Sequence, residues 1–247
     1  MLHEQTIEKL MDLGMRELAK AFRNQMQDNT LNSMSFEDRF GLLVDAQWTQ
    51  RTSKRIGSLI QKADFKFPQA CMEGLDFAAE RKLNRDLLLE LSQCKYIRDK
   101  HNILVMGAAG AGKTYLSNAL GVSACKKLFK VKYIRLPELL VDLSIARGDG
   151  SYKELLTQYK KVKLLILDEW MHKPVNETQA SDIFEIIESR YQVSSTIFVA
   201  QSDPAGWYQQ IGSGVIADAI LDRIVYNSYE VTLNGEVNMR ERLKLKI

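Results

Sequence analysis

The stretch of sequence that decides the fold is Ile103-Leu104-Val105-Met106-Gly107-Ala108-Ala109-Gly110-Ala111-Gly112-Lys113-Thr114. Its first four residues are apolar and predict a short buried strand, and the apolar run after Thr114 predicts a helix. Between them lies G-x-x-x-x-G-K-T, the P-loop pattern, in the strand–loop–helix context that the pattern requires. The alternative, a glycine-rich turn that binds nothing, does not explain why all these features occur together.

The residue types of this loop suit a phosphate chain. Glycines let the backbone N–H groups converge on one concavity at a helix N-terminus, where an anion is favoured. We expect Lys113 to reach the β- and γ-phosphates of ATP and the Thr114 hydroxyl to ligate Mg²⁺. The predicted nucleotide-binding residues of the loop are Gly107, Ala108, Ala109, Gly110, Ala111, Gly112, Lys113, Thr114 and Tyr115.

A second motif, Leu164-Leu165-Ile166-Leu167-Asp168-Glu169, combines a buried strand with two carboxylates at its end. We expect Asp168 to bind nucleotide and to hold the Mg²⁺ shell. Glu169 is then placed to polarise a water for attack on the γ-phosphate. Such a run is a weak signal alone, but after a P-loop and one intervening strand it predicts an ATPase, which converts ATP and water to ADP and phosphate.

A polar residue follows the strand predicted at 196–200. A polar side chain of Gln201-Ser202-Asp203-Pro204, at this strand end, is predicted to lie between the P-loop and Asp168 strands and to touch the γ-phosphate or the attacking water. A polar turn residue without any role is the alternative. Strands at 103–106, 131–134, 164–167, 196–200 and 228–233 alternate with helices, so we expect an α/β fold with a mainly parallel five-stranded sheet between helices.

Composition excludes several other classes of protein. Of the 247 residues, 45% are hydrophobic and 26% charged, as in a globular protein, and no run of 18 apolar residues predicts a membrane span. The opening residues predict no signal peptide. Three isolated cysteines, Cys71, Cys94 and Cys125, fit reduced thiols in a cytoplasm better than disulfides or a zinc site.

The first 62 residues show helical patterns and no strand signal. Ser35 and Asp38 have the spacing of a capping box, which predicts the start of a long helix. Its apolar side is predicted to carry Phe36, Phe40, Leu43, Val44 and Trp48.

Later turns of the same helix are basic. Arg51, Arg55 and Lys62 share one face, with Lys54 beside them. This stripe is predicted either to bind the phosphates of double-stranded DNA or to be a solvated face of a helical bundle. We expect a helical DNA-binding domain over residues 1–66, a connector over 67–100 and the ATPase domain over 101–247.

Three segments together carry a resemblance to a known family: Gly107–Thr114, Leu167–Trp170 and Ala217-Asp218-Ala219-Ile220-Leu221-Asp222-Arg223. With the terminal segment Leu233–Arg240, they resemble the IstB-like transposition helper ATPases, which belong with the DnaC-type helicase loaders in the AAA+ class. The resemblance implies a bacterial, cytoplasmic, ATP-dependent protein. It also implies that the protein oligomerises on target DNA and presents the DNA to a cognate transposase.

The resemblance also implies roles for single residues. Arg223 matches an arginine finger that reaches the nucleotide of a neighbouring subunit, whereas the residues alone allow a salt bridge to Asp218 or Asp222. Arg240 matches the arginine of the terminal segment. Gln201 matches the sensor position, although Val199-Ala200 precedes it where relatives have Thr-Ser, so Ser202 stays a competitor.

Two other functions compete with the transposition helper. A replicative helicase loader would favour an exposed apolar helix face in the N-terminal segment, whereas DNA binding requires the basic stripe. A scaffold that uses ATP only as an assembly ligand would have no need of Glu169.

Overall fold

The computed structural model describes residues 2–77, 83–212, 214–233 and 238–239. Contacts divide the chain into two compact units, Met1–Ser58 and Leu59–Ile247. In the described residues, we find no helix with the length and apolar character needed to cross a membrane.

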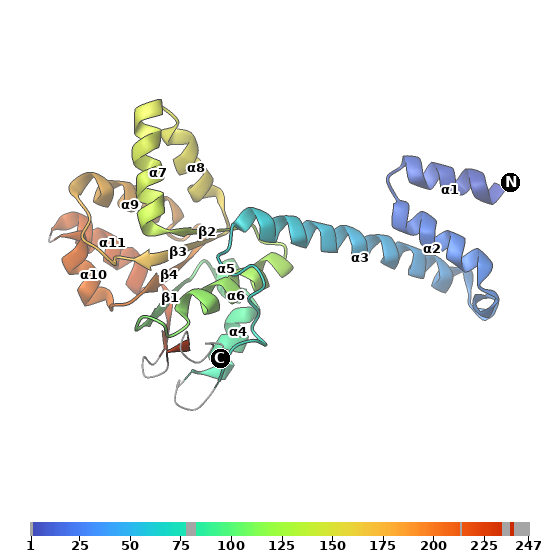
Figure 1. Cartoon of the computed structure of the whole chain (residues 1–247), viewed down its shortest axis with the longest axis horizontal. Helices are drawn as coiled ribbons and strands as arrows, with labels where there is room; N and C mark the ends of the chain where they lie inside the picture. The colour runs from blue at the N-terminus through green and yellow to red at the C-terminus, as the bar shows by residue number, and fades with distance from the viewer. Residues whose placement is uncertain (1, 78–82, 213, 234–237, 240–247) are drawn as a thin grey trace, which may run out of the picture. The chain divides into compact units, whose positions relative to one another are not determined.

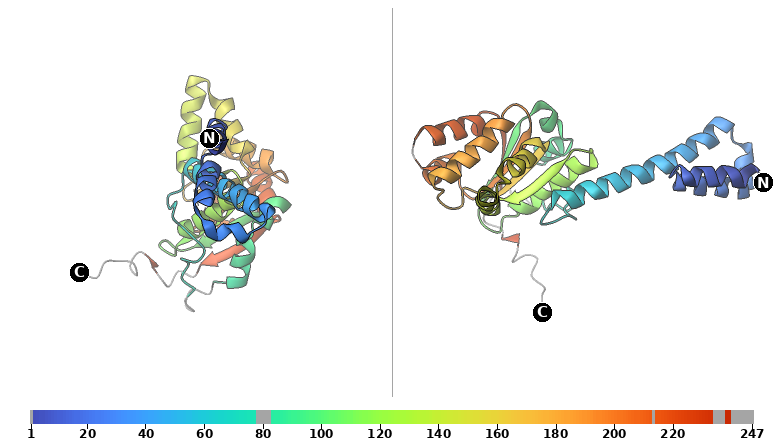
Figure 2. Two further views of the ribbon diagram at one scale, coloured as in Figure 1. Left: turned by 90° about the vertical axis from the view of Figure 1, so that its right-hand side faces the viewer. Right: turned by 90° about the horizontal axis from the view of Figure 1, so that it is seen from above.

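The first unit is built from helices. It contains α1 (Leu2–Asp12), α2 (Arg16–Gln27), a 3₁₀ turn (Asn29–Ser33) and most of α3 (Phe36–Ala63). Gly14 has φ of +70°, which lets the chain reverse between α1 and α2 (Figure 2). Ser35 caps α3 as predicted, because its Oγ accepts the Asp38 N–H at 3.1 Å. The Asp38 carboxylate accepts from the Ser35 hydroxyl at 2.8 Å, rather than from the Ser35 backbone as in a complete capping box.

The predicted apolar side of α3 is largely wrong. Leu43 is buried, but Phe36, Phe40, Val44 and Trp48 are exposed, with Trp48 at 68%. The reason is that α2 contacts α3 along a narrow and partly polar seam. The Gln25 side chain donates to the Arg39 carbonyl at 2.8 Å, and the Gln47 side chain accepts from the backbone of Leu18 at 3.3 Å.

The second unit contains the predicted sheet. Its strands are β1 (Asn102–Gly107), β2 (Val131–Arg135), β3 (Leu164–Trp170), β4 (Ser195–Ala200) and β5 (Ser228–Leu233). The strand order is β2-β3-β4-β1-β5, and every pairing is parallel. The α/β prediction is therefore confirmed, and β4 lies between the P-loop strand and the Asp168 strand. Residues Arg135 and Asp168 are paired across β2 and β3.

Helices cover both faces of this sheet (Figure 1). The first face packs against α4 (Arg85–Ser92), α5 (Lys95–Asp99) and α6 (Lys113–Lys126). The opposite face packs against α7 (Leu136–Asp149), α8 (Tyr152–Lys161), α9 (Glu177–Arg190), α10 (Pro204–Ile211) and α11 (Val215–Val225). Alternate strand residues enter the two cores: Ile103 and Val105 face α6, whereas Leu104 and Met106 face the second layer.

Local signals explain several helix boundaries. Asn84 caps α4, Pro137 lies in the first turn of α7, and Asn176 forms a capping box with Gln179 at α9. The sequence analysis missed α5 and α10. Tyr191 follows the last residue of α9, and its side chain is 37% exposed.

A buried arginine ties α9 to the strand that precedes the candidate site. Arg190 is 2% exposed and donates to the carbonyls of Tyr159 at 2.7 Å and Val162 at 2.9 Å, and to that of Ser195. Desolvation lowers the pKa of Arg190 to about 9. The guanidinium thus satisfies two carbonyl groups at the end of α8 and one at the start of β4, the strand that precedes Gln201.

Candidate nucleotide-binding site

The P-loop has the backbone shape that its glycines permit. Gly107, Gly110 and Gly112 all have positive φ angles, of +148°, +83° and +93°. At Gly107 a side chain is also excluded by space, because a Cβ there would lie 2.4 Å from the Leu233 carbonyl oxygen. The loop therefore curls tightly between β1 and the first turn of α6.

Lys113 lies over this loop. Its Nζ donates to the carbonyl oxygens of Gly107 at 2.7 Å and Ala108 at 2.8 Å. The ammonium group is thereby held at the mouth of the concavity, where it can balance the charge of a phosphate chain.

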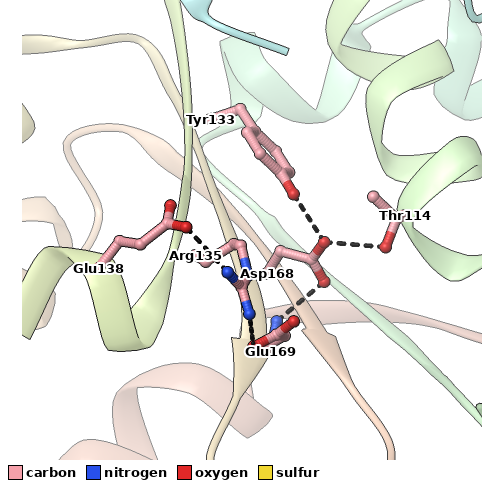
Figure 3. A network of polar contacts seen from close by, with 6 residues as sticks. All are labelled: Thr114, Tyr133, Arg135, Glu138, Asp168 and Glu169. Atoms are coloured by element: carbon pink, nitrogen blue, oxygen red, sulfur yellow. Dashed lines mark hydrogen bonds and ion pairs between the residues drawn. The ribbon is translucent and has the colours of Figure 1, made fainter. Parts of the chain in front are cut away.

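Asp168 joins the P-loop helix to the sheet (Figure 3). Its Oδ2 accepts hydrogen bonds from Thr114 Oγ1 and from the Tyr133 hydroxyl, each at 2.8 Å. Its Oδ1 accepts the backbone N–H of Glu169, also at 2.8 Å. Burial, with the Asp168 charge as the next cause, raises the pKa of Tyr133, so this hydroxyl stays a donor.

Glu169 is turned toward a basic neighbour. Its backbone has φ of +55°, in the left-handed region. Its Oε2 pairs with Arg135 Nη2 at 2.7 Å, and Arg135 Nη1 contacts Glu138 at 2.9 Å (Figure 3). The hydrogen bond from Arg135 lowers the pKa of Glu169 below its ordinary value. The Glu169 carboxylate is thus ionised and forms an ion pair with Arg135.

Lys113, Thr114, Asp168 and Glu169 line a cavity of about 580 Å³ at the carboxyl end of the strands. Its walls come from the connector, the P-loop, the ends of β3 and β4, and Met239. The lining residues are Lys66, Phe67, Gly74, Leu75, Asp76, Ala109, Gly110, Gly112, Lys113, Thr114, Tyr115, Asp168, Glu169, Trp170, His172, Val199, Ala200, Gln201 and Met239.

The connector contribution was missed by the sequence analysis. The ring centroids of Phe67 and Tyr115 lie 6.1 Å apart. The Phe67 backbone N–H donates to Asn118 Oδ1 at 2.9 Å. This contact tethers the connector to α6, beside the phosphate loop. The place of Phe67 beside the loop depends on these tertiary contacts, which no local sequence pattern indicates.

At the end of β4 the two sensor candidates differ in position. Gln201 lines the cavity. The Ser202 carbonyl accepts from Trp207 Nε1 at 2.8 Å, and a side chain added at Gly206 would collide with Ser202. Ser202 therefore packs at the start of α10, and this geometry favours Gln201 as the residue next to bound nucleotide.

Arg223 belongs to a different surface, on α11. Its Nε pairs with Glu188, its Nη1 donates to the Ala219 carbonyl at 2.9 Å, and the guanidinium lies 5.2 Å from the Phe184 ring centroid. The local ion pair considered from the sequence named the wrong acids, because α11 packs against α9 and presents Arg223 to Glu188. The fold does not bring Arg223 to the cavity formed by its own chain.

The remaining predicted site residues are distributed as follows. Arg51, Lys54 and Arg55 are exposed on α3 in the first unit, and Lys62 is exposed near the end of α3 in the second. Arg240 lies outside the described residues.

The donors at the cavity suit Mg²⁺ and a triphosphate. Thr114 and Asp168 offer hydroxyl and carboxylate oxygens, the ligand types that Mg²⁺ prefers, in hydrogen-bond contact with each other. Lys113 and the glycine backbone offer the cation and the N–H groups that bind phosphate. The residues present therefore fit both groups.

The chain matches the model of the family described as IstB-like ATP binding protein over residues 8–247. The chain belongs to this IstB-like family. A protein of Sinorhizobium fredii named as an insertion-sequence ATP-binding protein is 37% identical over 96% of both chains. A second such protein, from insertion sequence IS1162 of Pseudomonas fluorescens, is 37% identical over 81% of this chain and 87% of its own.

Solved structures share the fold of the IstB-like chain at low identity. DnaI matches with a TM-score of 0.59 and 21% identity, over 67% of this chain and 91% of its own. AMPPCP-bound DnaA from Aquifex aeolicus matches with a TM-score of 0.58 and 22% identity, over 72% of this chain and 54% of its own. These likenesses confirm the AAA+ fold.

Proposed function

We propose that this IstB-like chain is a Mg²⁺-dependent ATPase that assembles with itself on double-stranded DNA and delivers that DNA to a cognate transposase. The observation that carries the proposal is the convergence of Lys113, Thr114, Asp168 and Glu169 on one cavity. Insertion-sequence relatives named as ATP-binding proteins supply the transposition context.

In this proposal each side chain has one task. The P-loop backbone and Lys113 bind the phosphates, and Thr114 and Asp168 would hold the Mg²⁺ that would neutralise phosphate charge. Glu169 accepts a proton from the water whose oxygen attacks the γ-phosphorus, and ADP leaves. Gln201 orients the γ-phosphate or the water. The adjacent Phe67 and Tyr115 rings offer a surface for the base.

The DNA part of the proposal rests on the exposed basic residues Arg51, Lys54 and Arg55 of α3, with Lys62 as a further candidate. Contacts of this kind bind phosphates without reading base sequence. Such binding suits a helper that accepts many target sequences.

The substitution Glu169→Gln tests the enzymatic part. It should keep ATP binding, because Lys113, Thr114 and Asp168 remain, and it should lower the turnover number by about a hundredfold or more. Phosphate release and nucleotide affinity are measured together, and DNA complexes formed with ATP should become long-lived. As a control, Glu154→Gln on α8 should behave as wild type. Turnover within about threefold of wild type in Glu169→Gln would place the base elsewhere.

One observation favours a second function, a helicase loader. Four apolar side chains on α3, Phe36, Phe40, Val44 and Trp48, are exposed in the first unit, as docking to a partner protein would require. Binding of the chain to a purified replicative helicase, lost on Trp48→Ala and kept on Arg51→Ala, would support that function. DNA binding that is lost on Arg51→Ala and kept on Trp48→Ala would support the transposition helper.

A further inference from the structure

Tyr133 lies on β2 and donates a hydrogen bond to Asp168, a predicted Mg²⁺ ligand. None of the residues predicted to bind nucleotide or Mg²⁺ lies on β2. Tyr133 is the third residue of β2 and is 7% exposed. Its ring belongs to the core beneath α6, the same core that contains Leu116 on that helix. Only its hydroxyl makes a polar contact in Figure 3, and that contact is with Asp168.

The three hydrogen bonds to Asp168 fix the rotation of a buried carboxylate. Asp168 is 5% exposed, and its donors come from three different elements: Thr114 on α6, Tyr133 on β2 and the Glu169 backbone on β3. None of these donors is charged. Since Oδ2 accepts from both hydroxyls, Tyr133 determines which way the oxygen facing Thr114 points.

The direction of the Thr114 hydroxyl follows from this arrangement. A hydroxyl has one proton and two lone pairs, and Thr114 gives its proton to Asp168. Its lone pairs are then directed away from Asp168 and stay available for a cation at the start of α6. If Asp168 rotates, this hydroxyl can turn its proton toward the cation instead.

We propose that Tyr133 is a positioning residue for Mg²⁺, acting through Asp168 on Thr114. The proposal rests on the proposed function, because it concerns the Mg²⁺ that accompanies ATP. Loss of a residue that hydrogen-bonds to a metal ligand typically lowers metal affinity by about 10–100-fold. Tyr133 is not among the residues that line the cavity, so we expect its effect to be confined to the metal-dependent part of binding.

The test compares Tyr133→Phe with wild type in a binding assay with a fluorescent, non-hydrolysable ATP analogue. Affinity is measured across a Mg²⁺ titration and in EDTA. We expect the Mg²⁺ concentration that gives half-maximal tightening to rise about tenfold or more. Affinity in EDTA should stay unchanged, because the P-loop and Lys113 are intact. The matched control is Tyr159→Phe, which removes a hydroxyl from another buried tyrosine, on α8.

An unchanged Mg²⁺ titration in Tyr133→Phe would overturn the proposal. Equal loss of affinity with and without Mg²⁺ would also overturn it, because that result indicates damage to the fold. Failure of the proposed function gives a different result, since wild type itself would then show no Mg²⁺-dependent binding of the analogue.

Discussion

Lys113 is the basic residue of the P-loop, so no other residue of the loop can supply its positive charge. Lys113→Ala should weaken ATP binding by about a hundredfold or more, because removing one partner of a desolvated charge pair costs about 2–5 kcal/mol. ATP-dependent assembly on DNA should be lost with it. The exposed Lys126 at the end of the same helix provides the control Lys126→Ala. Nucleotide affinity that is equal in Lys113→Ala and wild type would exclude the phosphate role.

Arg135 forms an ion pair with Glu169, the proposed base. The distance from Arg135 Nη2 to Glu169 Oε2 is 2.7 Å, and both side chains are about a third exposed. Solvent screening limits such a pair to about 0.5–1 kcal/mol, so Arg135→Met should raise basal turnover about two- to fivefold. Basal turnover is measured as phosphate release without DNA. A fall in turnover would instead make Arg135 an aid to catalysis.

The same substitution should change the pH dependence of turnover. Arg135 lowers the pKa of Glu169, and the base must be ionised to accept a proton. Without Arg135 that pKa returns upward, so the acid limb of the rate profile should move to higher pH. Glu138→Gln leaves the Arg135–Glu169 contact in place and should keep the wild-type limb. An acid limb that Arg135→Met leaves unmoved would assign it to another group.

At the scale of elements, the local signals were sufficient for the sheet and the P-loop. Apolar runs at 103–106, 164–167 and 196–200 predicted β1, β3 and β4, and the mixed runs at 131–134 and 228–233 predicted β2 and β5. Asp168 lies within β3, near its carboxyl end. The strands β1, β3 and β4 are buried on both faces, so their sequences are continuously apolar and easy to recognise.

The parts of the site that the sequence did not reveal depend on how elements meet. Tyr133 and Arg135 reach Asp168 and Glu169 because β2 pairs in register with β3, and nothing local to β2 signals that pairing. Phe67 reaches the cavity only through its contact with α6. The sequence pattern identified the apolar residues of α3. It did not show that no described element of the first unit buries most of them, so that Phe36, Phe40, Val44 and Trp48 stay exposed.

The basic face of α3 gives a prediction at this scale. Replacing Arg51, Lys54 and Arg55 together by Ala should weaken DNA binding and flatten its salt dependence. The slope of log affinity against log salt should fall by about 0.9 for each DNA phosphate that the variant no longer neutralises. The control replaces three exposed lysines of the second unit, Lys126, Lys127 and Lys130, in the same way. An unaltered slope would move the DNA surface to the second unit, with Lys132, Arg135, Arg147 and Lys153 as candidates.

At the scale of the whole molecule, Arg223 is not among the described residues that line the cavity of its own chain. Among the residues described as lining it, the basic side chains are Lys66, Lys113 and His172. Arg223 lies on α11, held by Glu188 and by the rings of Phe184 and Tyr191. Its planar guanidinium suits phosphate oxygens, and a neighbouring copy can supply it.

The measurement that tests the shared site most directly is ATP turnover in a mixture of two inactive variants on DNA. Arg223→Ala should bind ATP almost normally and hydrolyse it poorly, with a loss on the order of a thousandfold. Lys113→Ala should not bind ATP but should retain its arginine. Mixed together, the two should recover part of the wild-type rate, because one supplies the nucleotide and the other the finger. Normal turnover in Arg223→Ala alone, or no recovery in a mixture shown to co-assemble, would contradict a site completed by a second copy.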